Sequence, residues 1–273
     1  SADNILLENN TLNNATKSGI MISDEYGSTV NGIIRGNTIN NVGDDAIAVY
    51  GNHSNLLIDS NRISGAKGFA GIAISCLQNG QQIRVDNETT GPHDIIVTGN
   101  VVSGCSGEAL YCIGSYKTYI TYNTLRDSIL EGVCLDSGCI GNYFAHNEVV
   151  NNGIAGGLPG VSIDNGIYNI VDSNNVYNNS CSGIKLVRTG LGNIIVNNIC
   201  TDNAYNQMGA KSSGIDIEPL AVETENLGYI DGLGSNWNVV LNNTVTGSHD
   251  FGVFIADDDT ANNGGSSCEN VIM

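Results

Sequence analysis

Apolar and polar residues alternate in short runs along the chain. The stretch "SGIDIE" at 213–218 places Ile215 and Ile217 on one face, and Asp216 and Glu218 on the other. A period of two is the pattern of a strand with one buried and one exposed face. Such segments recur, each opening on a small residue: "GIMI", "AIAV", "GIAI", "ALYC", "GVCL", "GVSI", "GIKL", "GIDI" and "GVFI". The pattern therefore predicts many short strands and indicates no helix.

A second motif alternates with these strands, and it carries an Asn within a short apolar run. Examples are "LLENNTL" at 6, "IIRGNTI" at 33 and "YITYNTL" at 119. The aligned residues are Asn10, Asn37, Asn61, Asn100, Asn123, Asn147, Asn174, Asn198 and Asn243, and their commonest spacing is near 24. A period in the twenties with short strands is typical of a solenoid. We expect each Asn to occupy a tight left-handed corner and to hydrogen-bond with the next coil through its amide.

On these repeats the chain resembles the right-handed parallel β-helix (pectate-lyase-like) superfamily over nearly its whole length. The resemblance implies an all-β solenoid of about nine coils, in one domain over 1–273. Its members include polysaccharide lyases, glycoside hydrolases, uronate epimerases, phage tailspikes and surface adhesins. The Asn- and Gly-rich style also resembles the disaggregatase of methanogenic archaea, which degrades a chondroitin-like envelope polymer. The pectate lyase and polygalacturonase motifs are not recognisable, so the resemblance implies no catalytic residue.

Aligning the second strand of each coil assigns residues to the two faces. The inward positions are all apolar, as a packed solenoid interior requires. Charge on the outward positions is confined to four consecutive coils, in Asp136, Asp164, Lys185, Asp216 and Glu218, with Arg188 just beyond the strand of Lys185. The sequence therefore predicts one exposed charged stripe along the solenoid.

This stripe has the chemistry of a glycan cleft. Carboxylates bind sugar hydroxyls and transfer protons, and we take Asp136, Asp164, Asp216 and Glu218 as the catalytic candidates. Coils stack about 4.8 Å apart, and like charges so close disfavour joint ionisation, which would separate Asp136 and Asp164 into an acid and a base. The sequence does not choose between retaining and inverting pairs. The candidates for substrate binding are Lys185, Arg188, Tyr50, Tyr111, Trp237 and Phe254.

Three functions fit this stripe, and a structural explanation competes with them. The first is glycoside hydrolysis by the carboxylates. The second is a polysaccharide lyase or uronate epimerase, in which Lys185 or Arg188 takes a proton beside a uronate while acidic residues hold Ca²⁺. The third is a glycan-binding surface or tailspike module without catalysis. The structural explanation is a solvated face with cross-strand salt bridges, Lys185 lying between Asp164 and Asp216.

The net charge of the chain limits the classes of molecule that it is expected to bind. The formal net charge is -18, which repels nucleic acid and anionic membranes. The sequence contains no run of about 18 apolar residues, the length that would span a membrane. We interpret the chain as a mature fragment of a longer, secreted or cell-surface protein. A homotrimer is a hypothesis that the fold leaves open. Insertions at 76–93 and 219–237, with Tyr229, would wall the groove.

Cysteines and metal ligands complete the expectations. The eight cysteines have no paired CxxC motif, so we predict free thiols, leave one or two disulfides open, and exclude a zinc site. Cys112 and Cys200 align with core positions. No cofactor is required, although Asp257–Asp259 offers oxygen ligands suited to Ca²⁺. The bland alternative for that run is a solvated turn.

Overall fold

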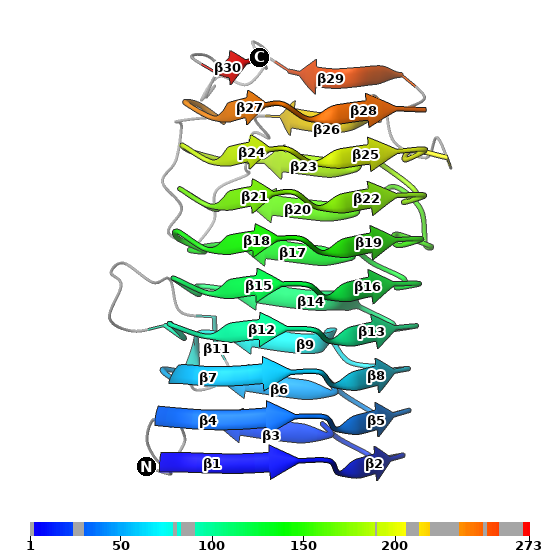
Figure 1. Cartoon of the computed structure of the whole chain (residues 1–273). Coiled ribbons are helices and arrows are strands. Elements are labelled where there is room, and N and C mark those ends of the chain that lie inside the picture. Colours follow the sequence, from blue (N-terminus) through cyan, green and yellow to red (C-terminus); the bar gives the residue numbers. More distant parts are fainter. Residues whose placement is uncertain are drawn as a thin grey trace.

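A computed structural model describes residues 3–23, 30–78, 81–82, 91–188, 190–205, 213–218, 235–247, 250–256 and 270–273. These residues form a parallel β-solenoid without any helix, in which three sheets run side by side along the stack of coils (Figure 1). The predicted class, an all-β parallel solenoid, is confirmed. Each sheet takes one strand from successive coils, because the chain visits the three sheets in turn.

The three sheets are named here by their order within a coil. Sheet A has ten strands: β1 (Asp3–Glu8), β4 (Val30–Arg35), β7 (Ser54–Asp59), β12 (Ile96–Thr98), β15 (Tyr119–Thr121), β18 (Tyr143–Ala145), β21 (Ile170–Asp172), β24 (Ile194–Val196), β27 (Val239–Leu241) and β30 (Val271–Ile272). Sheet B has nine: β2 (Thr11–Asn13), β5 (Thr38–Asn40), β8 (Arg62–Ser64), β13 (Val101–Ser103), β16 (Thr124–Arg126), β19 (Glu148–Val150), β22 (Asn175–Tyr177), β25 (Ile199–Thr201) and β28 (Thr244–Thr246).

Sheet C also has nine strands, which are those of the alternating segments. They are β3 (Ile20–Ser23), β6 (Ile47–Tyr50), β9 (Ala70–Ser75), β14 (Glu108–Ile113), β17 (Val133–Asp136), β20 (Val161–Asp164), β23 (Ile184–Val187), β26 (Ser213–Glu218) and β29 (Phe251–Ile255). A short antiparallel pair, β10 (Leu77–Gln78) with β11 (Gln81–Gln82), follows β9.

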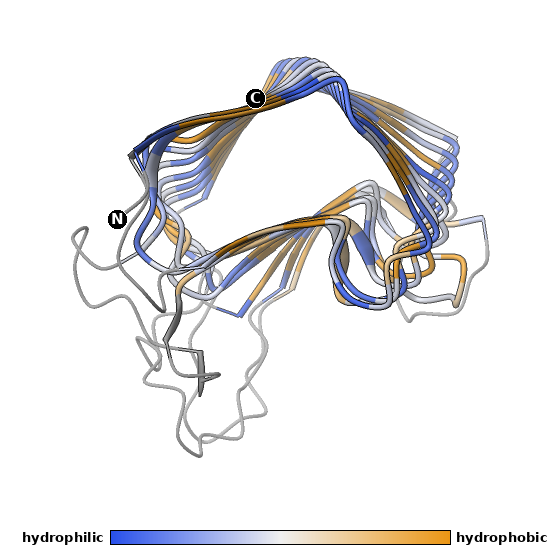
Figure 2. Cartoon of the chain, turned by 90° about the horizontal axis from the view of Figure 1, so that it is seen from below, coloured by the Kyte–Doolittle hydropathy of each residue, from blue (hydrophilic) through white to orange (hydrophobic). Residues whose placement is uncertain are grey.

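The register of sheet C is the one that the sequence predicts. Leu110 pairs with Val133, Val133 with Val161, and Ile184 with Ile215. Their side chains are buried and join one apolar core, which the inward residues of all three sheets fill. Figure 2 shows the three sheets arranged around the axis of the coil. The core is continuous from Ile20 to Val240, so each coil is stabilised mainly by its two neighbours.

Asparagine ladders hold the corners together. Between sheets A and B, Asn147 donates from Nδ2 to the Ile120 carbonyl at 2.9 Å and to Asn174 Oδ1 at 3.0 Å, and its Oδ1 accepts from the Asn123 backbone at 2.9 Å. The predicted hydrogen bonding between coils is therefore confirmed. Two further ladders occupy the other corners. One contains Asn142, Asn169, Asn193, Asn238 and Asn270, and the other contains Asn152, Asn179 and Asn203.

The left-handed corner residue is not the ladder Asn, which corrects that expectation. The positive φ falls on the residue before it, as at Tyr122 (φ 57) and His146 (φ 55). The preceding residue turns the chain, and this leaves the ladder side chain pointing between coils, where it is buried.

The cysteines agree with their predicted state within the described residues. Seven are free and buried, including Cys112 and Cys200 in the core, and Cys268 lies outside the described residues. Among the residues that the structure describes, no helix is long and apolar enough to cross a membrane.

Candidate functional site

The outer face of sheet C carries three columns of side chains, one more than the sequence predicts. The additional column precedes the small residue that opens each strand, and it contains Asp45, Glu108, Glu131 and Ser182. It was missed because the alignment began at the small residue. The signal was present in "DAI", "EAL" and "EGV", where a carboxylate stands directly before the predicted strand.

Four carboxyl groups gather on neighbouring coils at the middle of this face. We call Glu108, Glu131, Asp136 and Asp164 the carboxyl cluster. Glu108 opens β14 and Glu131 precedes β17, while Asp136 ends β17 and Asp164 ends β20. The backbone of Ala109 bonds to that of Glu131, and β17 pairs with β20, so all four belong to three adjacent coils. All four are half-buried, which leaves them accessible to a bound molecule.

Asp136 is held by three hydrogen bonds. The Tyr111 hydroxyl donates to Oδ2 at 2.7 Å, while the backbone and hydroxyl of Ser137 donate to Oδ1 at 2.5 and 2.9 Å. Burial, together with the Asp136 charge, raises the pKa of Tyr111 far above its usual range, so its hydroxyl keeps its proton. Tyr111 therefore positions a carboxylate, and its predicted part in substrate binding remains a prediction.

Asp164 lies beside a cation and yet keeps an affinity for protons. Arg188 Nη1 is 2.9 Å from Oδ2, while Oδ1 is buried and accepts no hydrogen bond from the described residues. Burial, reinforced by the nearby Asp136, raises the pKa of Asp164 to about 7, although Arg188 acts to lower it. Asp164 is therefore partly protonated at neutral pH. The division of Asp136 and Asp164 into a base and an acid remains a prediction.

Glu108 and Glu131 extend the same effect. Burial and the Glu131 charge raise the pKa of Glu108 to about 7, and burial raises the pKa of Glu131 as well. The cluster thus combines several carboxyl groups with Arg188, the one cation paired to it among the described residues. Such a site can release or accept a proton near neutrality.

The remaining charges of the stripe form a separate group. We call Lys185, Asp216, Glu218 and Ser182 the lysine cluster. Lys185 Nζ lies 2.7 Å from Glu218 Oε2 and 3.3 Å from Asp216 Oδ2, and Ser182 Oγ donates to the same Asp216 oxygen at 3.2 Å. Lys185 therefore pairs with Glu218 and Asp216, and not with Asp164 as the salt-bridge alternative supposed.

Asp216 does not face solvent, which corrects the prediction of a fully exposed stripe. Its side chain is 1% exposed, because Lys185 and Ser182 cover it. Burial raises its pKa to about 6 in spite of Lys185. Burial alone would lower the pKa of Lys185, but Asp216 and Glu218 raise it above its ordinary value. Lys185 is thus held charged, which is unsuited to taking a proton from a uronate.

The other predicted site residues are dispersed. Tyr50, on β6, donates a hydrogen bond from its hydroxyl to Asp45, which precedes that strand. On β29, Phe254 contacts Phe251 with ring centroids 5.1 Å apart. Trp237 is exposed at the corner that leads into β27 of sheet A, so the structure does not bring it to the carboxyl cluster. Tyr229, Asp257–Asp259 and much of both insertions lie outside the described residues. Within the described ranges, no group of three or more His, Cys, Asp or Glu side chains is arranged to hold a metal ion.

Comparison with known proteins places the fold. The family model described as "Right handed beta helix region" matches residues 1–90 and 81–264, so the chain belongs to the right-handed β-helix family. No curated protein sequence matches it.

Solved structures share this architecture at low sequence identity. The A-module of the Azotobacter vinelandii mannuronan C-5 epimerase AlgE6 superimposes with a TM-score of 0.64 at 11% identity, over 100% of this chain and 57% of that chain. The AlgE4 A-module of the same organism gives 0.57 at 11%, over 100% and 84%. A double mutant of the periplasmic alginate epimerase AlgG gives 0.62 at 13%, over 100% and 69%. This chain spans little more than half of the AlgE6 module, and these likenesses show the fold alone.

Proposed function

We propose that this chain is a polysaccharide-active enzyme, a glycoside hydrolase that acts at the carboxyl cluster of sheet C. The observation that carries the proposal is Asp164, a carboxyl group with a pKa of about 7, one strand away from the hydrogen-bonded Asp136. Glycoside hydrolysis requires two carboxyl groups that differ in protonation at working pH. The structural neighbours include a mannuronan C-5 epimerase and an alginate epimerase, which supports a polysaccharide as the substrate class.

Each residue has a role in this proposal. Protonated Asp164 donates its proton to the glycosidic oxygen as the bond to the leaving sugar breaks. Asp136 attacks the anomeric carbon or activates water there, and Tyr111 orients it through the 2.7 Å hydrogen bond. Arg188 holds Asp164 in place, and it stabilises the carboxylate once its proton has left. Burial, with the charges of Asp136 and Glu131, raises the pKa of Asp164 and so keeps it protonated.

The strand register favours one stereochemical outcome. Asp136 and Asp164 end adjacent strands, whose usual separation is about 4.8 Å. That is closer to the roughly 5–5.5 Å between the carboxyl groups of retaining enzymes than to the roughly 6.5–9.5 Å of inverting ones. We therefore expect retention at the anomeric carbon. NMR of the first product formed checks it.

A product-resolved assay tests the proposal. Neutral and uronate-containing polysaccharides are incubated with the wild-type chain, Asp136→Asn and Asp164→Asn, and new reducing ends are counted. Glu148→Gln on sheet B is the matched control, since this carboxylate also bonds to a tyrosine, Tyr177, on the same stretch of the solenoid. Both cluster variants should lose about 10²-fold or more in turnover, while the control stays active. Full turnover in both cluster variants would sink the proposal.

A lyase or epimerase acting on a uronate is the second candidate. Arg188 favours it, because a guanidinium among carboxyl groups can bind the carboxylate of a uronate. The net charge of -18 opposes an anionic polymer, and for this reason the hydrolase comes first. An unsaturated uronate product would absorb in the near ultraviolet, and exchange of the C5 hydrogen with deuterated solvent would reveal epimerisation. If either signal is seen with the wild-type chain and is lost in Asp164→Asn, the function is that of a lyase or epimerase and not of a hydrolase.

The location follows from the proposed substrate. Polysaccharides of this kind lie outside the cytoplasm, and one structural neighbour is described as periplasmic. We therefore expect a secreted or cell-surface protein. A glycan-binding module without turnover is the outcome if binding occurs and no product of any kind is released.

A further inference from the structure

One outward column of sheet A is apolar over its whole length. Strand pairing places ten residues in this column, which we call the apolar ladder: Leu6, Ile33, Leu57, Ile96, Tyr119, Tyr143, Ile170, Ile194, Val239 and Val271. They lie on the face opposite the core, since their neighbours Ile34, Val97 and Phe144 are the buried ones. The strands of sheet A are stacked at the front left of the solenoid, beside those of sheet B (Figure 1).

The ladder is exposed to a degree unusual for apolar residues in a row. Leu6 is 58% exposed, Tyr119 49%, Ile96 44% and Ile194 37%, and the remaining members are half-buried or exposed. Single exposed apolar residues are ordinary, whereas a contiguous apolar patch on a protein surface marks an interaction site.

The equivalent column of sheet B shows that the solenoid does not require this pattern. Its strand pairs align Thr11, Thr38, Arg62, Val101, Thr124, Glu148, Asn175, Ile199 and Thr244, which are mostly polar. Both columns stand at the same height on the same coils and face away from the same core. The apolar composition of the sheet A column is therefore a property of that face and not of the repeat.

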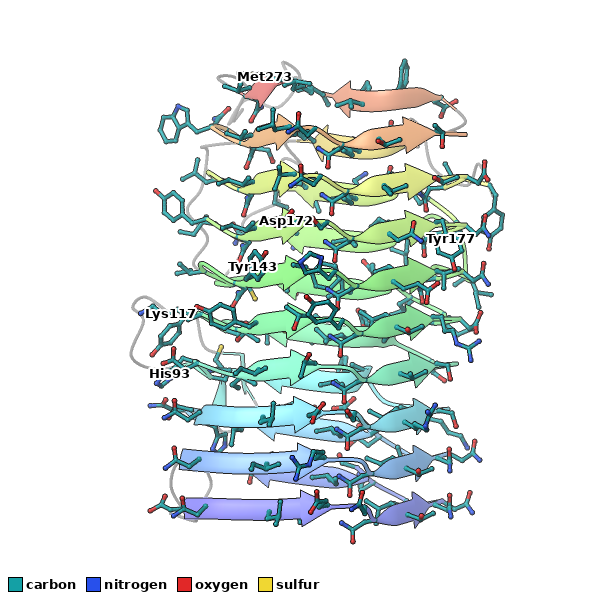
Figure 3. The ribbon with its side chains drawn as sticks, viewed as in Figure 1. His93, Lys117, Tyr143, Asp172, Tyr177 and Met273 are labelled. Atoms are coloured by element: carbon teal, nitrogen blue, oxygen red, sulfur yellow. The ribbon has the colours of Figure 1, made fainter. Side chains whose placement is uncertain are left out.

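Charge beside the ladder is sparse. In the neighbouring column of sheet A, Arg35 pairs with Glu8 at 2.6 Å. Asp172 accepts hydrogen bonds from Tyr143 and Ser173 at 2.9 and 2.8 Å. Figure 3 shows Tyr143 and Asp172 on this face. In that column Glu8, Asp59 and Asp172 are acidic and Arg35 is basic, so its net charge is -2 (one minus three) against -18 for the chain. This face therefore adds little to the repulsion between two copies.

We propose that the apolar ladder packs against the ladder of a second copy of this chain. Aliphatic side chains dominate it and offer no hydrogen bonds, which makes it unsuited to a sugar. A second copy presents the same residues at the same strand repeat of about 4.8 Å, so the rows of two ladders interdigitate without mismatch. Ten strands give a strip about 45 Å long. Most of its strands have three residues and span about 10 Å, so the strip covers about 450 Å² per copy. That is a little over half of the roughly 800 Å² of a stable interface, and it fits a weak dimer.

Paired charge substitutions test this interface independently of any catalysis. Molar mass is measured by sedimentation velocity from low to high micromolar concentration for the wild-type chain and for Ile96→Glu/Ile194→Glu. The matched control is Val101→Glu/Ile199→Glu, which places the same charges on sheet B in the same two coils. We expect the wild-type chain and the control to self-associate, and the ladder variant to bind its own copy at least about a hundredfold more weakly, because buried unpaired charges are costly.

Three results would overturn the proposal: a wild-type chain that is monomeric throughout, a ladder variant that associates as the wild type does, or a control that dissociates equally. Circular dichroism verifies that each variant folds. If the glutamate pair prevents folding, Ile96→Thr/Ile194→Thr replaces it, because Thr keeps the strand preference while removing apolar contact. That milder pair should still weaken association about tenfold.

Discussion

The carboxyl cluster and the lysine cluster lie on the same sheet, and each contains aspartate beside a cation. In the lysine cluster, one ammonium serves two carboxylates, and Ser182 supplies a further donor to Asp216. In the carboxyl cluster, four acidic groups have Arg188 as their paired cation within the described residues, and two of them have a pKa of about 7. The first arrangement is nearly balanced and suits structural stability, whereas the second retains protons to exchange and suits catalysis.

The largest expected difference is in stability. Lys185→Met removes the cation and leaves Asp216 buried without a charged partner. We expect a loss of about 3–5 kcal/mol in the free energy of unfolding, the usual consequence of breaking a buried pair from one side. Asp164→Asn removes a carboxylate that is already costly to ionise, and it should leave the protein as stable or more so. Urea denaturation at neutral pH measures both, and an equal loss in the two variants would erase the distinction between the clusters.

The pH dependence of stability is the next largest effect. Glu108 and Asp164 have folded pKa values of about 7, above the roughly 4 of an unfolded chain. A raised pKa means that the folded state binds the proton more tightly. This stabilisation is therefore complete below about pH 4 and is lost as pH rises through about 7. The urea concentration at the unfolding midpoint should therefore decrease as the buffer is changed from mildly acidic to mildly alkaline.

The double variant Glu108→Gln/Asp164→Asn is the companion measurement. It should reduce this fall, because two of the groups with a raised pKa are gone, while Glu131 and Asp216 retain the rest of it. Glu218→Gln, in the lysine cluster, should leave the fall in place. A wild-type profile that rises with pH would contradict the assigned shifts. Under the proposed function, turnover should also decline above about pH 7, since Asp164 must carry the proton.

The smallest effect concerns Tyr111. Tyr111→Phe removes the 2.7 Å hydrogen bond to Asp136 and keeps the ring. Loss of one hydrogen bond to a charged group should cost about 1.5–3 kcal/mol, seen as roughly tenfold or more in turnover if Asp136 reacts. The control Tyr177→Phe removes the matching bond to Glu148 on sheet B and should not alter turnover. Equal activity of both variants would assign Tyr111 to folding alone.

The fold was predictable because the same two sequence motifs, an alternating strand and an Asn corner, repeat along the chain. Period-two alternation gave the strands of sheet C and their register, and the ladder Asn gave one corner. The strands of sheets A and B are mostly three residues long, too short for alternation to distinguish their two faces unaided. The other two ladders escaped notice because they are shorter and begin part-way along the chain, at Asn142 and Asn152.

The candidate site was predictable only in part. Asp136 and Asp164 were identified because they fall on outward positions of aligned strands. Glu108 and Glu131 were missed because they lie one residue before the repeat that the alignment used. The burial of Asp216 could not be inferred, because it depends on how the Lys185 stem folds across the sheet rather than on strand parity. Similarly, strand alternation places Tyr111 on the outer face but does not predict that its hydroxyl donates a hydrogen bond to Asp136.

The asparagine ladders also determine how such a protein can change its length. Asn61 donates to Asn100 at 2.9 Å although 39 residues separate them, just as Asn37 donates to Asn61 over 24. The ladder therefore aligns each coil with the next, whatever the number of residues in the coil. A coil can thus contain an insertion without losing its ladder bond to its neighbour. Growth along the axis, by contrast, occurs in whole steps of about 4.8 Å, one coil at a time. After duplication or loss of a whole coil, the ladder bonds can form again between the new neighbours, so the length of the rod can change by one coil at a time.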